Sequence, residues 1–169
     1  MFIYLFGLPA AGKNYVGQVL AEDFGFTFYD GDIDLTQEMR DAVRDQIPFT
    51  DGMRDRYYAR LTDRIEELRQ TAPDLAFGQA TFKERHRRQI AASFPDVVFV
   101  LVQADEVVRM ARLRESNSAV TVEYARLIAS FFEPPKHAHI VIENNDRREA
   151  VVSQLASWLT RQSPNINSE

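Results

Sequence analysis

The sequence predicts a three-layer α/β/α fold, in which a parallel sheet of about five strands lies between two layers of helices. Three observations support this expectation. Short apolar runs alternate with longer amphipathic segments along the chain. The runs are continuously apolar, as in strands that are covered on both faces. A glycine-rich loop joins the first run to the first amphipathic segment.

The apolar runs that are expected to form strands are residues 2–6, 26–29, 74–78, 97–102 and 139–142. The first and fourth runs are the most apolar, so both are expected near the centre of the sheet. Apolar residues at helical spacing predict the intervening helices, near residues 16–24, 35–46, 53–68, 82–92, 105–114, 122–132 and 151–159. Residues 115–121 are rich in Ser, Asn and Thr, and are expected to form a short lid.

Composition limits the classes of function. A chain of 169 residues fits one domain, expected over residues 1–162 with a flexible tail at 163–169. The net charge of -5 gives no overall basic field for nucleic acid, and the absence of cysteine excludes disulfides and thiolate chemistry. The first apolar run is too short to cross a membrane. We therefore expect a cytoplasmic protein, monomeric or homodimeric, that acts on a small molecule.

The glycine-rich loop has two glycines and a lysine at the spacing of a P-loop, the phosphate-binding turn between a strand and a helix. Its backbone amides and lysine are expected to hold ATP, through Gly7, Leu8, Pro9, Ala10, Ala11, Gly12, Lys13 and Asn14. Asn14 stands where the pattern has Ser or Thr, so its amide oxygen is the expected Mg²⁺ ligand. The alternative is a glycine turn that only joins strand to helix. The loop makes a P-loop NTPase-type fold the expectation.

Two carboxylates, Asp30 and Asp32, follow the second predicted strand. They stand two residues apart, so along an extended chain both would point to the same side. We expect Asp32 to act as the base for an attacking hydroxyl and Asp30 to help hold Mg²⁺. The alternative is turn chemistry, and Asp34 is expected to cap the next helix.

Several further stretches extend the pattern, and with them the chain resembles the gluconate kinase and shikimate kinase group of P-loop kinases. The likeness covers most of the chain, and its order and spacing are similar. It rests on the P-loop and on residues 28–32, 48–54, 83–87 and 130–134. The matching gluconate kinase stretches contain Asp-Gly-Asp, Pro-Leu-x-Asp-x-x-Arg, Ala-Leu-Lys-x-x-Tyr-Arg and Ser-Gln-Phe…Glu-Pro.

The resemblance assigns further site residues. It implies that Arg54 and Arg87 hold the carboxylate of the acceptor and that Lys83 lies near them. Gly78 falls in the stretch that matches the glycine run of shikimate kinases, and is expected to contact the acceptor. Two arginines would lie at the lid, Arg112 toward the nucleotide and Arg114 as a catalytic cation on the transferred phosphate. A place on a helix surface is the alternative for Lys83, Arg112 and Arg114.

The predicted function is an ATP- and Mg²⁺-dependent kinase that phosphorylates a hydroxyl of a sugar acid or a similar carboxylated metabolite, in carbohydrate metabolism. Two alternatives remain open. Asn14 would suit a nucleotide-binding module with weak or no turnover, and the same sheet would suit a nucleoside monophosphate kinase. His137 and His139 are not expected to bind metal, since no third ligand lies nearby in the sequence.

Overall fold

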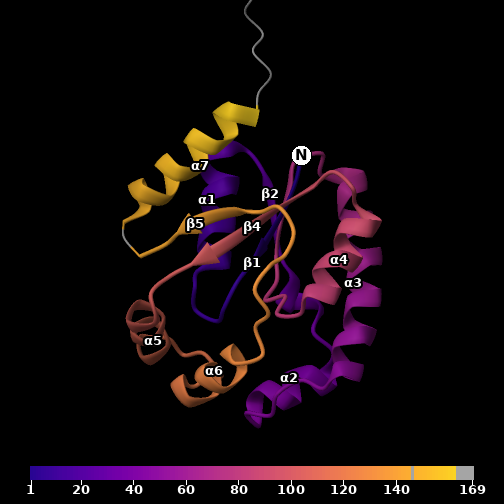
Figure 1. Ribbon diagram of the computed structural model, residues 1–169, viewed down its shortest axis with the longest axis vertical. Coiled ribbons are helices and arrows are strands. Elements are labelled where there is room, and N and C mark those ends of the chain that lie inside the picture. Colours follow the sequence, from indigo (N-terminus) through magenta and orange to yellow (C-terminus); the bar gives the residue numbers. More distant parts are fainter. Residues whose placement is uncertain (146, 163–169) are drawn as a thin grey trace, which may run out of the picture.

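The computed structural model describes residues 1–145 and 147–162 of the chain. This part forms a five-stranded sheet with helices on both faces (Figure 1). The predicted fold class is confirmed. The predicted flexible tail, residues 163–169, lies outside the described residues. The strands are β1 (Phe2–Phe6), β2 (Thr27–Asp30), β3 (Leu75–Gly78), β4 (Val97–Gln103) and β5 (Ile140–Glu143).

The strands follow the order β2-β3-β1-β4-β5, and every neighbouring pair is parallel. The register pairs Phe2 of β1 with Leu75 on one side and with Val97 on the other. All five residues of β1 are buried, in agreement with its predicted central place. Because all strands run the same way, their carboxyl ends meet at one edge, which is where open α/β sheets bind ligands.

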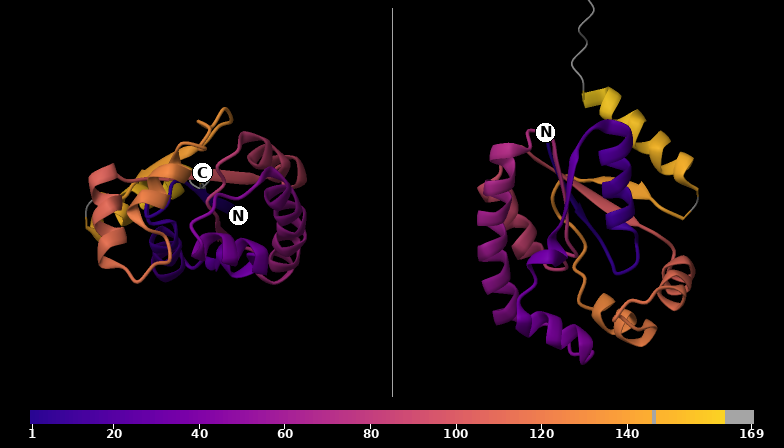
Figure 2. Two further views of the ribbon diagram at one scale, coloured as in Figure 1. Left: turned by 90° about the horizontal axis from the view of Figure 1, so that it is seen from below. Right: turned by 180° about the vertical axis from the view of Figure 1, so that it is seen from behind.

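Helices connect the strands and cover both faces of the sheet (Figures 1 and 2). Helices α1 and α7 lie on one face, and α3 and α4 lie on the other. Shorter helices, α2, α5 and α6, gather near the carboxyl ends of the strands. The helices are α1 (Lys13–Phe24), α2 (Gln37–Arg44), α3 (Asp51–Thr71), α4 (Glu84–Ser93), α5 (Glu106–Glu115), α6 (Val122–Ala129) and α7 (Arg148–Gln162), with a 3₁₀ turn, η1 (Gly31–Asp34), after β2. Within residues 1–145 and 147–162, no helix is both long and apolar enough to cross a membrane.

The sheet separates two apolar cores. Alternate residues of β1 point to opposite faces, so Tyr4 packs with the cluster under α3, whereas Ile3 and Leu5 pack with the cluster under α1 and α7. The central strand is thereby fixed from both sides. The loop that follows β1 therefore starts from a fully buried strand.

One predicted helix cap is wrong. Asp34 does not cap α2; it accepts hydrogen bonds from the Tyr29 hydroxyl at 3.0 Å and from Arg64 Nε at 3.3 Å. Thr36 is the cap, and its hydroxyl accepts from the Met39 amide at 3.2 Å. Asp34 is the last residue of the 3₁₀ turn after β2, so α2 begins at Gln37 and not at residue 35 as its apolar pattern predicts.

Candidate active site

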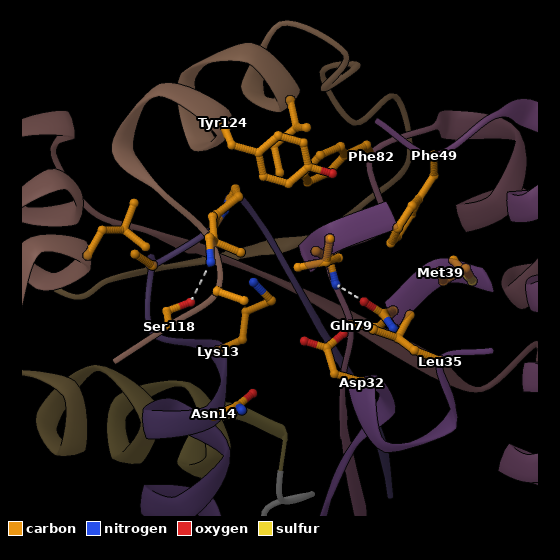
Figure 3. A pocket seen from close by; sticks show the side chains of 18 of the residues that line it. Lys13, Asn14, Asp32, Leu35, Met39, Phe49, Gln79, Phe82, Ser118 and Tyr124 are labelled. Atoms are coloured by element: carbon orange, nitrogen blue, oxygen red, sulfur yellow. Dashed lines mark hydrogen bonds between the residues drawn. The ribbon is translucent and has the colours of Figure 1, made fainter. Parts of the chain in front are cut away.

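A cavity of about 570 Å³ lies beyond the carboxyl ends of the strands. This volume is in the range of small-molecule sites. The P-loop forms one side of it, η1, α2 and α3 form another, and α5, α6 and the segment between them close the rest. In Figure 3, Lys13 and Asp32 approach one another on one side of the cavity, while Phe49, Phe82 and Tyr124 lie across from them.

The two P-loop glycines are required by their surroundings. Gly7 has φ 148°, and a Cβ there would lie 2.3 Å from the carbonyl oxygen of Val102. Gly12 has φ 95°, and a Cβ there would lie 2.0 Å from the side-chain nitrogen of Asn144. Both contacts are shorter than real Cβ atoms tolerate, and both backbone conformations favour glycine. The loop therefore takes a shape that only its glycines allow.

Side chains from α5 and from the end of β5 hold the outside of the loop. Arg112 Nη1 donates to the carbonyl oxygens of Ala10 and Ala11, at 3.2 and 3.3 Å. The side-chain nitrogen of the buried Asn144 donates to the same Ala11 oxygen at 2.9 Å. The backbone carbonyl of Asn144 accepts from Arg112 Nη2 at 2.6 Å. Arg109 adds a longer bond, 3.4 Å, to the carbonyl of the loop proline. Because these side chains hold the carbonyls of residues 9–11 from outside, the amides at the start of α1 remain available for an anion.

Sequence reasoning missed Arg109 and Asn144 as parts of this arrangement. Arg109 stands one helical turn before Arg112, and that spacing was the only signal that both could face the loop. Asn144 is a polar residue that directly follows a strand, as Asp32 nearly does. Nothing in the neighbouring sequence indicates that the Asn144 side chain is buried.

Lys13 is half-buried at the head of α1, and its ammonium donates to the carbonyls of Gly7 and Leu8 at 3.3 and 3.2 Å. Burial lowers the pKa of Lys13, and the charges of Asp32 and Asp30 counteract that effect. The ammonium thus lies inside the loop and close to two carboxylates.

Asp30 and Asp32 differ in their surroundings. Asp30 Oδ1 accepts from the Asp32 amide at 3.0 Å, and its other oxygen accepts from the side-chain nitrogen of Asn14. Asp32 opens into the cavity, where the walls reduce its hydration and raise its pKa; Asp30 raises it further and Lys13 lowers it. A carboxylate with a raised pKa is a better proton acceptor than an ordinary aspartate, so Asp32 has the properties of a base.

The donor set beside Lys13 fits a magnesium ion. The nitrogen of the Asn14 amide is taken by Asp30, which leaves the Asn14 amide oxygen for a cation. Amide and carboxylate oxygens are the hard ligands that Mg²⁺ prefers, and it commonly uses one or two of them together with water and phosphate. No group of three or more His, Asp or Glu residues that could hold a metal occurs in the described part of the chain, so an all-protein cage is not what this site provides.

Arg54, near the start of α3, lines the same cavity. It is 8% exposed and donates to the carbonyl of Phe49. Burial lowers the pKa of Arg54, and the charge of Asp51 partly compensates. A guanidinium has five N–H donors, so this bond leaves donors for a ligand.

Four of the six residues that the resemblance assigned do not line the cavity, and among the predicted P-loop and metal residues Gly7, Leu8, Ala11 and Asp30 do not line it either. Arg87 is fully buried and donates to the Glu84 carboxylate and to the backbone carbonyls of Thr81 and Glu133, at 2.9, 2.6 and 2.6 Å. Lys83 pairs with Glu133 at 3.1 Å. These contacts connect α4 to the segment before β5. They also occupy the Arg87 guanidinium and the Lys83 ammonium, which were expected to bind or lie near the acceptor. The other two are Arg114, which is exposed on α5, and Gly78, which ends β3.

The predicted lid, between α5 and α6, covers part of the cavity and is tied to the end of α2. Ser118 and Val120 line the cavity. The Gln46 side chain donates to the Ala119 carbonyl at 2.6 Å and accepts from the Thr121 hydroxyl at 2.8 Å. The lid is thus fixed to the end of α2, and its Ser118 lies beside Lys13 in Figure 3.

A braced P-loop before the first helix of a parallel β2-β3-β1-β4-β5 sheet defines a P-loop kinase fold. No protein-family model matches the sequence. A probable gluconokinase from Dictyostelium discoideum is 25% identical over 124 residues, which cover 70% of this chain and 62% of that protein. The match therefore spans less than two thirds of the relative.

Solved structures agree in fold over nearly the whole chain. A gluconokinase from Sinorhizobium meliloti 1021 has a TM-score of 0.76 at 22% identity, covering 96% of this chain and 97% of that one. A shikimate kinase from Acinetobacter baumannii, solved in complex with shikimate, has a TM-score of 0.59 at 21% identity, covering 96% and 94%. The resemblance to the gluconate and shikimate kinase group is confirmed.

Proposed function

We propose that the protein is an ATP- and Mg²⁺-dependent kinase that transfers the γ-phosphate of ATP to a hydroxyl of a small carboxylated metabolite. One observation carries the proposal: Lys13 of a braced P-loop and the carboxylate of Asp32 meet in one cavity, with Arg54 in the same cavity. The likeness to a gluconokinase and a shikimate kinase supports it.

Each residue has a separate task in this proposal. The amides at the start of α1 and the Lys13 ammonium hold the phosphates and stabilise charge that develops on them. Asp32 accepts the proton of the attacking hydroxyl. Asn14 and Asp30 would hold Mg²⁺, which when bound neutralises charge on the phosphate oxygens. Arg54 would pair with the carboxylate of the acceptor.

A nucleotide-binding module without useful turnover is the second candidate, and Asn14 favours it. Asn14 stands where the P-loop pattern has a Ser or Thr whose hydroxyl binds the metal. Here the Asn14 side-chain nitrogen donates to Asp30 instead. On that reading an Asn14→Ser variant would gain much activity. On the kinase reading the native chain turns over already, and the serine variant changes its rate by less than about tenfold.

ADP release tests the proposal directly. The purified protein is incubated with Mg-ATP and, separately, with gluconate, related sugar acids, shikimate, aromatic hydroxy acids, simple sugars and nucleoside monophosphates. Acceptor-dependent ADP release with a carboxylated alcohol supports the kinase, and release only with a monophosphate refutes it. ATP binding without turnover on any acceptor favours the binding module.

A further inference from the structure

The acceptor side of the cavity has almost entirely apolar walls. Beyond Lys13 and Asp32, the side chains come from the residue after η1, from α2, from the segments before α3 and before α4, and from α6 (Figure 3). Those that the argument uses are Leu35, Met39, Val43, Phe49, Phe82 and Ile128. A solute in this part of the cavity touches carbon atoms on most sides.

The tyrosines in the wall add little to its polarity, because each of their hydroxyl protons is already donated to the protein. The Tyr57 hydroxyl donates to a backbone carbonyl at 2.7 Å and accepts from the Gln79 side chain. The Tyr58 hydroxyl donates to a buried threonine at 3.0 Å, and that of Tyr124 donates to a backbone carbonyl at 2.8 Å. The other end of the Gln79 amide accepts from a backbone N–H at 2.6 Å. The hydroxyl protons of these tyrosines and the Gln79 side-chain oxygen are therefore bonded within the protein.

Such walls select against a polyol. Every acceptor hydroxyl that leaves water without finding a partner lowers affinity by about tenfold. Gluconate carries several hydroxyls beside its carboxylate, whereas the apolar side chains named above have no hydrogen-bonding group. Asp32 can accept from one hydroxyl and Arg54 can pair with one anionic group, while Ser116 and Ser118 line the cavity only at the lid. An apolar ring in the same space would instead gain from leaving water and from contact with aromatic side chains.

We propose that the acceptor is a hydroxy acid with a ring-sized apolar body, a hydroxyl that reaches Asp32 and a carboxylate that pairs with Arg54. This inference rests on the proposed kinase function. The acceptor oxygen forms a bond to the γ-phosphorus, the bond from that phosphorus to the β–γ bridging oxygen breaks, and ADP leaves with the electron pair. The hydroxyl proton passes to Asp32.

The test compares a polyol acid with aromatic acids that carry the same two functional groups. Gluconate and 3- or 4-(hydroxymethyl)benzoate each carry one carboxylate and a primary alcohol, but only gluconate is a polyol. Binding is measured by calorimetry and turnover by ADP release from Mg-ATP. We expect at least one aromatic acid to bind about tenfold or more tightly than gluconate, with a negative heat-capacity change, and to release ADP.

A matched pair of variants locates the effect. Val43→Thr keeps the shape of the α2 wall but adds a hydroxyl, and Val107→Thr makes the same change at a position that is 80% exposed on α5. We expect Val43→Thr to weaken binding of the aromatic acid about three- to tenfold without weakening gluconate, and Val107→Thr to leave both unchanged.

The outcomes separate this inference from the proposed function. Binding of the aromatic acid that responds to Val43→Thr, without any ADP release, keeps the apolar site and refutes the kinase. ADP release with gluconate in preference to both aromatic acids keeps the kinase and overturns the inference. Failure of both aromatic acids to bind also overturns it, as does an equal effect of the two threonine variants.

Discussion

Under the proposed function, the phosphate side and the acceptor side of the cavity are built in different ways. The phosphate side comes from one stretch of chain, residues 7–14, and acts mainly through backbone amides and one lysine. The acceptor side collects side chains from η1, α2, α3 and α6, and it acts through their shape and polarity. A site built from one stretch of backbone has a fixed chemistry that can be recognised in the local sequence. A site built from side chains of several elements can change its ligand through the substitution of any wall residue.

Removing the lysine of the phosphate side should have the largest effect. We expect Lys13→Ala to lower turnover about 1,000-fold, because among the residues that the structure describes no other ammonium lies inside the loop to stabilise charge on the phosphate. ADP release is the measurement. Lys136→Ala, the same change at an exposed position, is the matched control and should keep full activity. Unaltered ATP affinity and turnover in Lys13→Ala would rule out the proposed phosphate site.

Asp32 stands between the two sides, and its loss should separate binding from chemistry. We expect Asp32→Asn to lower turnover about 100-fold or more, since the amide cannot accept the hydroxyl proton, while ATP affinity stays within about threefold of the native value. Calorimetry and ADP release give the two quantities. Asp63→Asn, on the exposed side of α3, controls for the loss of a charge. Equal turnover in both variants would contradict the role of Asp32.

The pH dependence of turnover should report the same carboxylate. Asp32 must be ionised to take a proton, and its pKa is raised by burial and by Asp30, so activity is lost as pH falls through a value above that of an ordinary aspartate. The loss should approach about tenfold per pH unit. At high pH, activity should fall as Lys13 loses its proton, below its ordinary value of 10.5. An acid limb that remains in Asp32→Asn would assign it to another group.

The smallest effect should come from the metal ligand. We expect Asn14→Ala to raise the Mg²⁺ concentration for half-maximal turnover about tenfold, with a smaller change in the maximal rate. Titration of Mg²⁺ at saturating ATP measures it. Gln18→Ala removes an exposed amide from the same helix and should leave the titration unchanged. Identical titrations of Asn14→Ala and the native protein would exclude Asn14 as a ligand.

The fold and the phosphate side could be predicted because their signals are local. The apolar run at Phe2–Phe6 followed by the glycines and Lys13 defines strand, loop and helix within a single stretch. Arg87 shows where such reasoning stops. From sequence alone, its guanidinium was expected to bind the carboxylate of the acceptor. In the structure it is buried and donates hydrogen bonds to residues up to 46 positions away. Only the folded chain reveals that pairing.

The acceptor side was less predictable for the same reason. The apolar residues of α2 and α3 have the spacing of ordinary core positions, and nothing local distinguishes Met39 or Tyr57, which reach the cavity, from Leu61, which lies only in the core. Asn144 and Arg109 brace the P-loop across more than 90 residues of sequence. Asp34 was misplaced because its preference for a cap competed with a hydroxyl and a guanidinium brought by tertiary contacts.

The attachment of the lid to α2 links two properties of the cavity. Gln46, which holds the lid at Ala119 and Thr121, also donates through its amide and side-chain nitrogens to the carbonyl of Val43, at 3.1 and 2.7 Å. Val43 is part of the apolar wall. The wall residue Val43 and the residue that anchors the lid, Gln46, are therefore directly hydrogen-bonded, so a ligand that displaces Val43 would also disturb the hydrogen bonds of the lid.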